Sequence, residues 1–227
     1  MSGIEAVTNA SAFEGGRNTE TDAEFRERYY LSVDFAGGVN IDAIVAEIYE
    51  SVEAVIAVAG EENDTDVQSE SGLPPHSIEI IAYGGLDEDV AGAIFRRKAA
   101  GIQTYGNTSV SVVSSAGTTH KIKFSRPTPV NVWVKITGLK TDSVFPLDGI
   151  DRIKQNIVEY IGSNTRGGMA IGQDVICVTL PTEVLKVPGV VDFDLQISSN
   201  GSVFSRENIT IAAREKAVTD ESKVTVE

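Results

Sequence analysis

Short apolar runs and helical periods alternate along this chain, and polar or glycine-rich turns separate them. After Asn40, which is a good N-cap residue, apolar side chains recur at spacings of three and four, which predicts one buried helix face: Ile41, Ile44, Val45 and Ile48. Comparable periods predict further helices at residues 21–33, 87–100, 147–161 and 179–186.

Apolar or alternating runs predict strands, and short polar turns join several of them. The expected strands cover residues 54–60, 77–83, 110–113, 121–124, 130–137, 175–178, 190–198, 205–212 and 223–226. An Asn-Gly pair at 200–201 predicts a tight hairpin, and an Ala-Gly pair at 116–117 predicts another.

Two patterns in the second half indicate which faces are buried. The helix expected at 147–161 carries one apolar stripe: Ile150, Ile153, Ile157 and Ile161. The strand at 130–137 alternates strictly between apolar and mostly polar side chains, which is typical of a strand with one buried face. Trp133 lies on the opposite face, so that face is expected to be covered or to form an interface.

This order of elements predicts an α+β fold of two small mixed α/β units, with mainly antiparallel or mixed sheets. The stiff Arg-Pro-Thr-Pro segment ending at 129 separates a first unit at 19–126 from a second at 127–227, and residues 1–18 form an extended lead-in. Residues 44–60 align loosely with residues 181–197, which indicates a degenerate internal repeat.

Charge narrows the set of partners. The 227 residues include 33 acidic and 19 basic side chains, for a net charge of −14, and no basic patch is visible. Binding to nucleic acid through its phosphates needs such a patch, and an acidic chain gains no attraction to anionic lipid. We therefore expect no nucleic-acid partner.

The sequence also bears on where the chain is made. No apolar run reaches the length that a membrane span needs, so we expect no membrane insertion. The first sixteen residues lack the pattern of a signal peptide, so we expect the chain to be made in a cytoplasm. The one cysteine, Cys177, lies in an apolar run and is expected to be a buried, unreactive thiol.

An acidic loop at 61–76 is the first candidate for chemistry. Asp64 and Asp66 are the side chains that a hard cation such as calcium would use. The spacing does not match an EF-hand loop, so we expect a solvated acidic loop, no metal and no cofactor. The alternative is a carbohydrate- or metal-binding module that combines loop 61–70 with the exposed aromatic residues Trp133 and Tyr105.

A rigid corner closes this loop. It comprises Gly72, Pro74, Pro75 and His76. His76 precedes a serine, so a hydrolase is a third hypothesis, but no strained nucleophile elbow is present, and we expect His76 to close the corner through a hydrogen bond.

Two further turns are candidate binding sites. Gly84 and Gly85 join a strand to a helix that Asp87 is expected to cap and Gly101 to close. This turn lacks a phosphate-binding fingerprint and is followed by acidic residues, so a structural turn is expected. Arg166, in a glycine-rich loop, is a candidate for gripping a partner's carboxylate.

Four segments, in this order, resemble the baseplate J-like family of phage tail proteins. They are residues 4–30 (IEAVTNASAFEGGRNTETDAEFRERYY), 72–107 (GLPPHSIEIIAYGGLDEDVAGAIFRRKAAGIQTYGN), 122–136 (IKFSRPTPVNVWVKI) and 187–195 (VPGVVDFDL). The family usually has a further N-terminal domain before the first segment, and because this sequence starts almost at that segment, we expect that domain to be missing here. The family's Val-Pro-Gly-Val element is present at 187–190. Its counterpart in the first half, residues 52–55, has neither proline nor glycine, which argues against a sharp turn there.

The resemblance implies a structural protein without enzymatic activity or cofactor. It implies a location in the tail baseplate of a virion, or of a related contractile injection machine, after synthesis in the host bacterial cytoplasm. The implied partners are other baseplate and tail proteins and further copies of the chain around the tail axis.

Overall fold

The computed structural model describes residues 38–163 and 167–227. The lead-in expected at 1–18, the helix expected at 21–33 and Arg166 lie outside the described residues. Within the described ranges, the chain forms four α-helices and ten strands in several small sheets with both parallel and antiparallel pairs. The predicted α+β class is confirmed.

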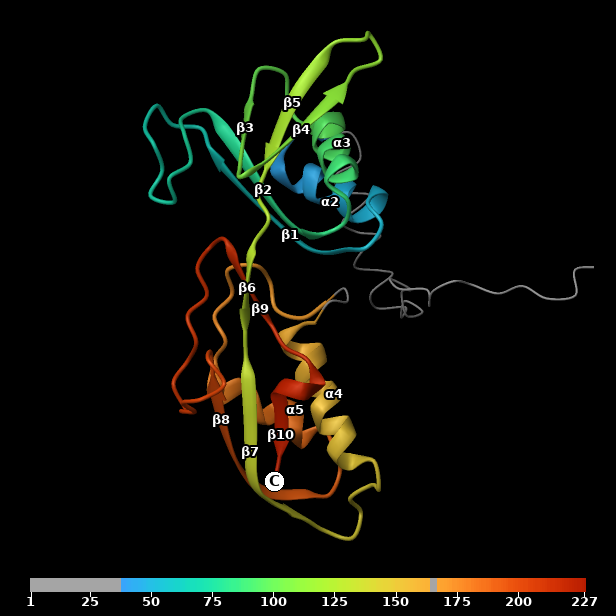
Figure 1. Ribbon diagram of the computed structural model, residues 1–227, viewed down its shortest axis with the longest axis vertical. Coiled ribbons are helices and arrows are strands. Elements are labelled where there is room, and N and C mark those ends of the chain that lie inside the picture. The colour runs from blue at the N-terminus through green and yellow to red at the C-terminus, as the bar shows by residue number, and fades with distance from the viewer. Residues whose placement is uncertain (1–37, 164–166) are drawn as a thin grey trace, which may run out of the picture.

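Two hydrophobic cores lie on either side of residues 126–129, one in each half of the molecule (Figure 1). The first unit contains α2 (Ile41–Ser51), β1 (Val55–Asn63), β2 (Ser77–Gly84), α3 (Asp87–Arg97), β3 (Gln103–Tyr105), β4 (Thr108–Val113) and β5 (Thr119–Phe124). The second unit contains β6 (Thr128–Asn131), β7 (Trp133–Thr141), α4 (Gly149–Ile161), α5 (Pro181–Leu185), β8 (Val190–Ser198), β9 (Glu215–Val218) and β10 (Val224–Val226).

In the first unit, β2 is the central strand of a three-stranded sheet, antiparallel to β1 and parallel to β3. The β4–β5 hairpin and helices α2 and α3 complete the core. Helix α2 begins as predicted, since the Asn40 side chain accepts a hydrogen bond from the Ala43 amide at 2.9 Å. Ile44 and Ile48 on its inner face are buried.

In the second unit, β7 is the central strand between β8, which is antiparallel, and β10, which is parallel. The predicted alternation is confirmed, because Val132, Val134 and Ile136 are buried. Helix α4 packs its isoleucines on this core, but Ile150, in the first turn, is 43% exposed, so the apolar stripe begins one turn later than predicted.

The ends of α3 differ from the prediction. Leu86 occupies the N-cap position without a side-chain bond, and the Asp87 carboxylate accepts instead from Arg126. The helix ends at Arg97, because Lys98 is already extended. Gly101 lies three residues beyond Lys98, so it does not close the helix as predicted.

Two predicted strands are wrong. Residues 205–212 form only isolated bridges, of Ser205 with Ile197 and of Ile209 with Val175. Side chains replace the regular ladder here: the Asn208 amide oxygen accepts from the Cys177 backbone at 3.0 Å, and Asp174 accepts from the Ile211 backbone at 2.7 Å. Residues 175–178 contain one bridge and then enter a 3₁₀-helix at Cys177–Thr179.

The predicted internal repeat is visible at one element. Strands β1 and β8 both have nine residues, and each follows a helix through a residue with left-handed backbone. That residue is Gly189, at φ 83°, in the second unit and Ala54, at φ 57°, in the first. The sharp turn at 52–55 is therefore present despite the missing glycine, contrary to expectation. The likeness ends there, since β1 pairs with the strand that follows it and β8 with one that precedes it.

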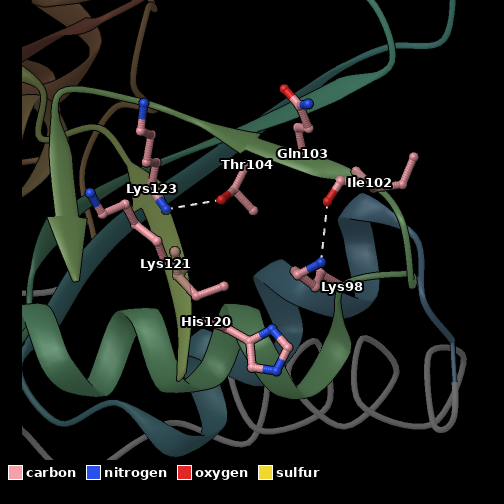
Figure 2. Close-up of a pocket in the computed structure, with 8 residues that line it drawn as sticks. Lys98, Ile102, Gln103, Thr104, His120, Lys121 and Lys123 are labelled. Atoms are coloured by element: carbon pink, nitrogen blue, oxygen red, sulfur yellow. Dashed lines mark hydrogen bonds between the residues drawn. The ribbon is translucent and has the colours of Figure 1, made fainter. Parts of the chain in front are cut away.

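Strands β3 and β5 meet at one point and leave a cleft beside it. The Lys123 amide donates to the Thr104 hydroxyl at 2.9 Å where the strands meet. The cleft has a volume of about 300 Å³ and lies next to the end of α3 (Figure 2).

Candidate functional site at the junction of the two units

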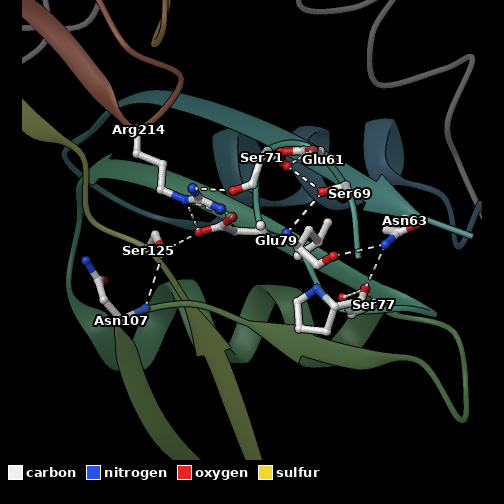
Figure 3. A network of polar contacts seen from close by, with 12 residues as sticks. Glu61, Asn63, Ser69, Ser71, Ser77, Glu79, Asn107, Ser125 and Arg214 are labelled. Carbon is white, nitrogen blue, oxygen red and sulfur yellow. Dashed lines mark hydrogen bonds and ion pairs between the residues drawn. The ribbon is translucent and has the colours of Figure 1, made fainter. Parts of the chain in front are cut away.

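A buried carboxylate lies where the two units meet. Glu79 lies on the apolar strand β2 and is fully buried although its side chain is a carboxylate. Its carboxylate accepts from the Ser125 hydroxyl at 2.5 Å and from the guanidinium group of Arg214 at 2.5–3.0 Å (Figure 3). A buried carboxylate needs such compensation, since an unpaired charge away from water is strongly unfavourable.

Arg214 reaches this carboxylate from the second unit, 135 residues along the chain. Arg214 directly precedes β9, and the parallel pairing of β9 with β6 places Arg214 beside the connecting segment. The Arg214 carbonyl accepts from the Thr128 amide at 3.0 Å. A further guanidinium nitrogen donates to the Ser71 carbonyl at 2.9 Å. Its hydrogen bonds to Glu79 raise the pKa of the Arg214 guanidinium, which therefore stays protonated.

Arg126 anchors the connecting segment to the first unit. Its guanidinium donates to the carbonyls of Ala82, Gly84 and Gly85 at 2.6–2.9 Å and pairs with Asp87 at 2.6 Å. It also lies 5.0 Å from the centre of the Phe124 ring. The segment predicted to separate the units is thus fastened to both, and the junction is fixed by charged hydrogen bonds.

Of this junction, the sequence indicated only the connecting segment. Glu79 was assigned to a strand without a role, and Arg214 was not singled out. The one available signal was a single carboxylate inside the apolar run of residues 77–83. Such a residue is buried only when it is paired.

Asn63 organises the acidic loop, whose first residues belong to β1. Asn63 is buried, and its amide nitrogen donates to the carbonyls of Val67, Leu73 and Pro74 at 2.7–3.1 Å. Glu61 accepts from the Ser71 hydroxyl, so it does not point freely into solvent. Asp64 is exposed, and no hydrogen bond or ion pair of its side chain occurs within the described ranges.

The predicted corner has left-handed backbone at its two ends. Gly72 has φ 85° and His76 has φ 50°, and Leu73 between them is fully buried. His76 Nε2 lies 2.8 Å from Asp66 Oδ1, with both side chains largely exposed, so the histidine closes the loop by a local hydrogen bond. The Pro74 carbonyl accepts from the Ser77 hydroxyl at 2.6 Å, while Pro75 is exposed.

The remaining predicted residues have structural contacts. Gly84 and Gly85 both have positive φ, and a side chain on Gly84 would lie 2.4 Å from the Ala54 carbonyl, which explains the glycine. Trp133 is half-buried and packs against Gly201 of the Asn-Gly turn, so part of its face is covered by this chain. Cys177 is buried, and burial raises the pKa of its thiol, as expected of an unreactive cysteine.

Among residues 38–163 and 167–227, no three histidine, cysteine, aspartate or glutamate side chains come together to hold a metal ion. No helix in the same ranges has the length and apolar character required to cross a membrane.

Calcium titration tests the acidic loop directly. We expect no binding at micromolar calcium by calorimetry, because Glu61 and Asp66 are engaged with Ser71 and His76 and the ligand spacing is wrong for a calcium loop. Micromolar binding that disappears when Asp64 and Asp66 are both replaced by alanine would contradict this prediction.

A second buried charge belongs to the second unit. Lys216 on β9 is fully buried, and its ammonium group donates to the Met169 carbonyl at 2.6 Å. No carboxylate pairs with it among the described residues. Burial lowers the pKa of the Lys216 ammonium group.

Lys216→Met is expected to raise the free energy of unfolding by about 1 kcal/mol at pH 7, because methionine fills the space without the desolvation cost of a charge. Between the lowered folded pKa and the unfolded value of about 10.4, the unfolded state binds more protons, so wild-type stability rises with pH. The advantage of the variant should therefore shrink as the pH approaches about 10.4. Urea unfolding at pH 7 and pH 10 measures both effects.

Lys140, whose side chain and partner Asp192 are both exposed, is the matched control, and Lys140→Met should change stability by less than about 0.5 kcal/mol. A Lys216→Met protein less stable than wild type at pH 7 would show that the bond to Met169 outweighs the cost of burying the charge.

No model of a protein family matches the chain, and no curated protein matches it.

Proposed function

We propose that this chain is a structural subunit of the tail baseplate of a bacteriophage or a related contractile injection machine. It works by protein–protein contact and catalyses no reaction. The four ordered segments that resemble the baseplate J-like family support this proposal, and so does the confirmed α+β class with its one repeated turn. Its partners are other baseplate and tail proteins and further copies of itself.

The observation that carries the proposal is the Glu79–Arg214 junction. A subunit whose function is positional must hold its surfaces at a fixed distance and angle. A doubly hydrogen-bonded ion pair between two units, with its carboxylate fully buried, serves that need, because neither unit can turn without leaving Glu79 unpaired. Arg126 adds a second fastening at the connecting segment.

The charge of −14 predicts how the subunit associates. Copies of the chain repel one another at low salt, so we expect the isolated chain to be mainly monomeric by light scattering. Ring formation then needs complementary heterologous patches or a partner that supplies positive charge. A stable oligomer at low salt that is unaffected by added salt would contradict this expectation.

Gene deletion tests the function. In cells that carry the gene beside genes for tail tube and sheath proteins, deletion is expected to leave particles without a complete baseplate in negative-stain electron microscopy. A plasmid copy should restore them, and an Arg214→Ala copy should restore fewer. Complete, active particles after deletion would refute the proposal, as would the absence of any tail genes near this one.

A further inference from the structure

The cationic side chains of residues 38–126 divide into two groups. The three arginines each pair with a carboxylate within the unit: Arg96 and Arg97 share Glu47, at 2.7 and 2.8 Å, and Arg126 pairs with Asp87. The three lysines are Lys98, Lys121 and Lys123. None of them has a carboxylate partner among the residues that the structure describes.

All three lysines line the cleft between β3 and β5 (Figure 2). Lys98 lies at its base, where its ammonium group donates to the Ala99 and Ile102 carbonyls at 3.3 and 3.2 Å. Lys121 and Lys123 are exposed and share one face of β5. Ile102 and Ile122 add apolar surface. In a chain of net charge −14, this cleft gathers every lysine of the first unit that the structure describes.

The cleft also exposes a strand edge. In the antiparallel β4–β5 pair, alternate residues bond across the ladder, and the others turn their backbone groups outward. Just beyond the two strands, the Thr118 carbonyl accepts from the Ser114 amide at 2.8 Å, so the backbone groups of even-numbered β5 residues face β4. The Lys123 amide turns away to Thr104, as expected if odd-numbered residues face outward. The backbone N–H and C=O groups of Thr119 and Lys121 therefore point away from β4, toward the side of the cleft. No described residue bonds to them.

We infer that this cleft binds an extended acidic segment of a partner protein, which adds to β5 as a further strand. Its backbone would bond to Thr119 and Lys121, and carboxylates at every second residue would lie opposite Lys121 and Lys123. The two-residue spacing of these lysines favours a strand over a compact anion, which cannot use both the ammonium groups and a row of backbone groups. The inference rests on the cleft alone and does not depend on the proposed tail function.

Lysines also occur on strand edges simply to prevent unwanted pairing. The two roles make opposite predictions. Lysines that only protect an edge bind no added strand, whereas a lysine pair that recognises acidic strands binds those whose carboxylates are two residues apart.

The test uses the full chain and a blocked peptide, TVEVEVT, with carboxylates two residues apart. Binding measured by fluorescence anisotropy at low salt should weaken as salt rises. The neutral peptide TVQVQVT and the misphased peptide TEEVVVT should bind at least about tenfold more weakly. Hydrogen exchange should slow at the Thr119 and Lys121 amides when TVEVEVT is bound.

The variant Lys121→Gln plus Lys123→Gln should weaken TVEVEVT binding about tenfold and keep its fold, since both side chains are exposed. Lys140→Gln plus Lys186→Gln, which removes the same charge from exposed sites in the second unit, should bind like wild type. The inference is overturned by any of three results: no binding of TVEVEVT, equal binding of TVEVEVT and TEEVVVT, or displacement of TVEVEVT by millimolar inorganic phosphate, which would mark a general anion site.

Discussion

Replacing Arg214 by alanine is expected to lower the free energy of unfolding by about 3 kcal/mol. The substitution leaves the Glu79 carboxylate buried, with the Ser125 hydroxyl as its one remaining side-chain partner among the described residues. The estimate stands at the low end for broken buried pairs, because the Arg214 side chain is itself 37% exposed and part of the pair is screened by water. Urea unfolding measures the loss.

Two controls separate the buried charge from other effects. Arg206→Ala removes an exposed arginine that pairs with Asp194 and should change stability by less than about 0.5 kcal/mol. Adding Glu79→Gln to Arg214→Ala removes the uncompensated charge and should recover part of the loss. If the free energy of unfolding of Arg214→Ala lies within about 0.5 kcal/mol of the wild-type value, the junction does not hold the units together.

Gly189→Ala is expected to lower the free energy of unfolding by at least about 2 kcal/mol. Left-handed backbone at φ 83° is unfavourable for alanine, and the new methyl group would lie 2.4 Å from the backbone nitrogen of Phe145. Because that neighbour is backbone, it cannot move aside as a flexible side chain would.

Ala54→Gly is the matched substitution at the equivalent turn. It relieves about 1 kcal/mol of left-handed strain, but glycine adds a similar amount of freedom to the unfolded chain, so we expect stability within about 0.5 kcal/mol of wild type. Thermal unfolding of both variants compares the turns. A Gly189→Ala protein as stable as wild type would show that the turn adapts, and a large loss in Ala54→Gly would show that the Ala54 side chain has a packing role.

Local patterns predicted much of the fold. Asn40 and the isoleucines after it defined α2, and the alternation from Val130 to Ile136 defined the buried face of β7, because spacing within one element decides both. Where side chains compete with the backbone ladder, the same approach failed: residues 205–212 look like a strand, but Asn208 and Asp174 take over the hydrogen bonds.

The junction was beyond local patterns for a different reason. Glu79 and Arg214 are 135 residues apart, and each looks like an ordinary charged residue in its own segment. Asp87 was assigned to a helix cap because the sequence cannot indicate that Arg126 reaches it from across the unit. The left-handed Ala54 was missed likewise, since alanine carries no signal for that conformation.

Cryo-electron microscopy of tail particles from cells that produce this chain tests the central proposal most directly. We predict density in the baseplate that fits residues 38–163 and 167–227 as a single body, repeated around the tail axis, with Glu79 and Arg214 in contact in every copy. Particles with a complete baseplate in which this chain is absent, from both the density and mass spectrometry, would contradict the proposed function.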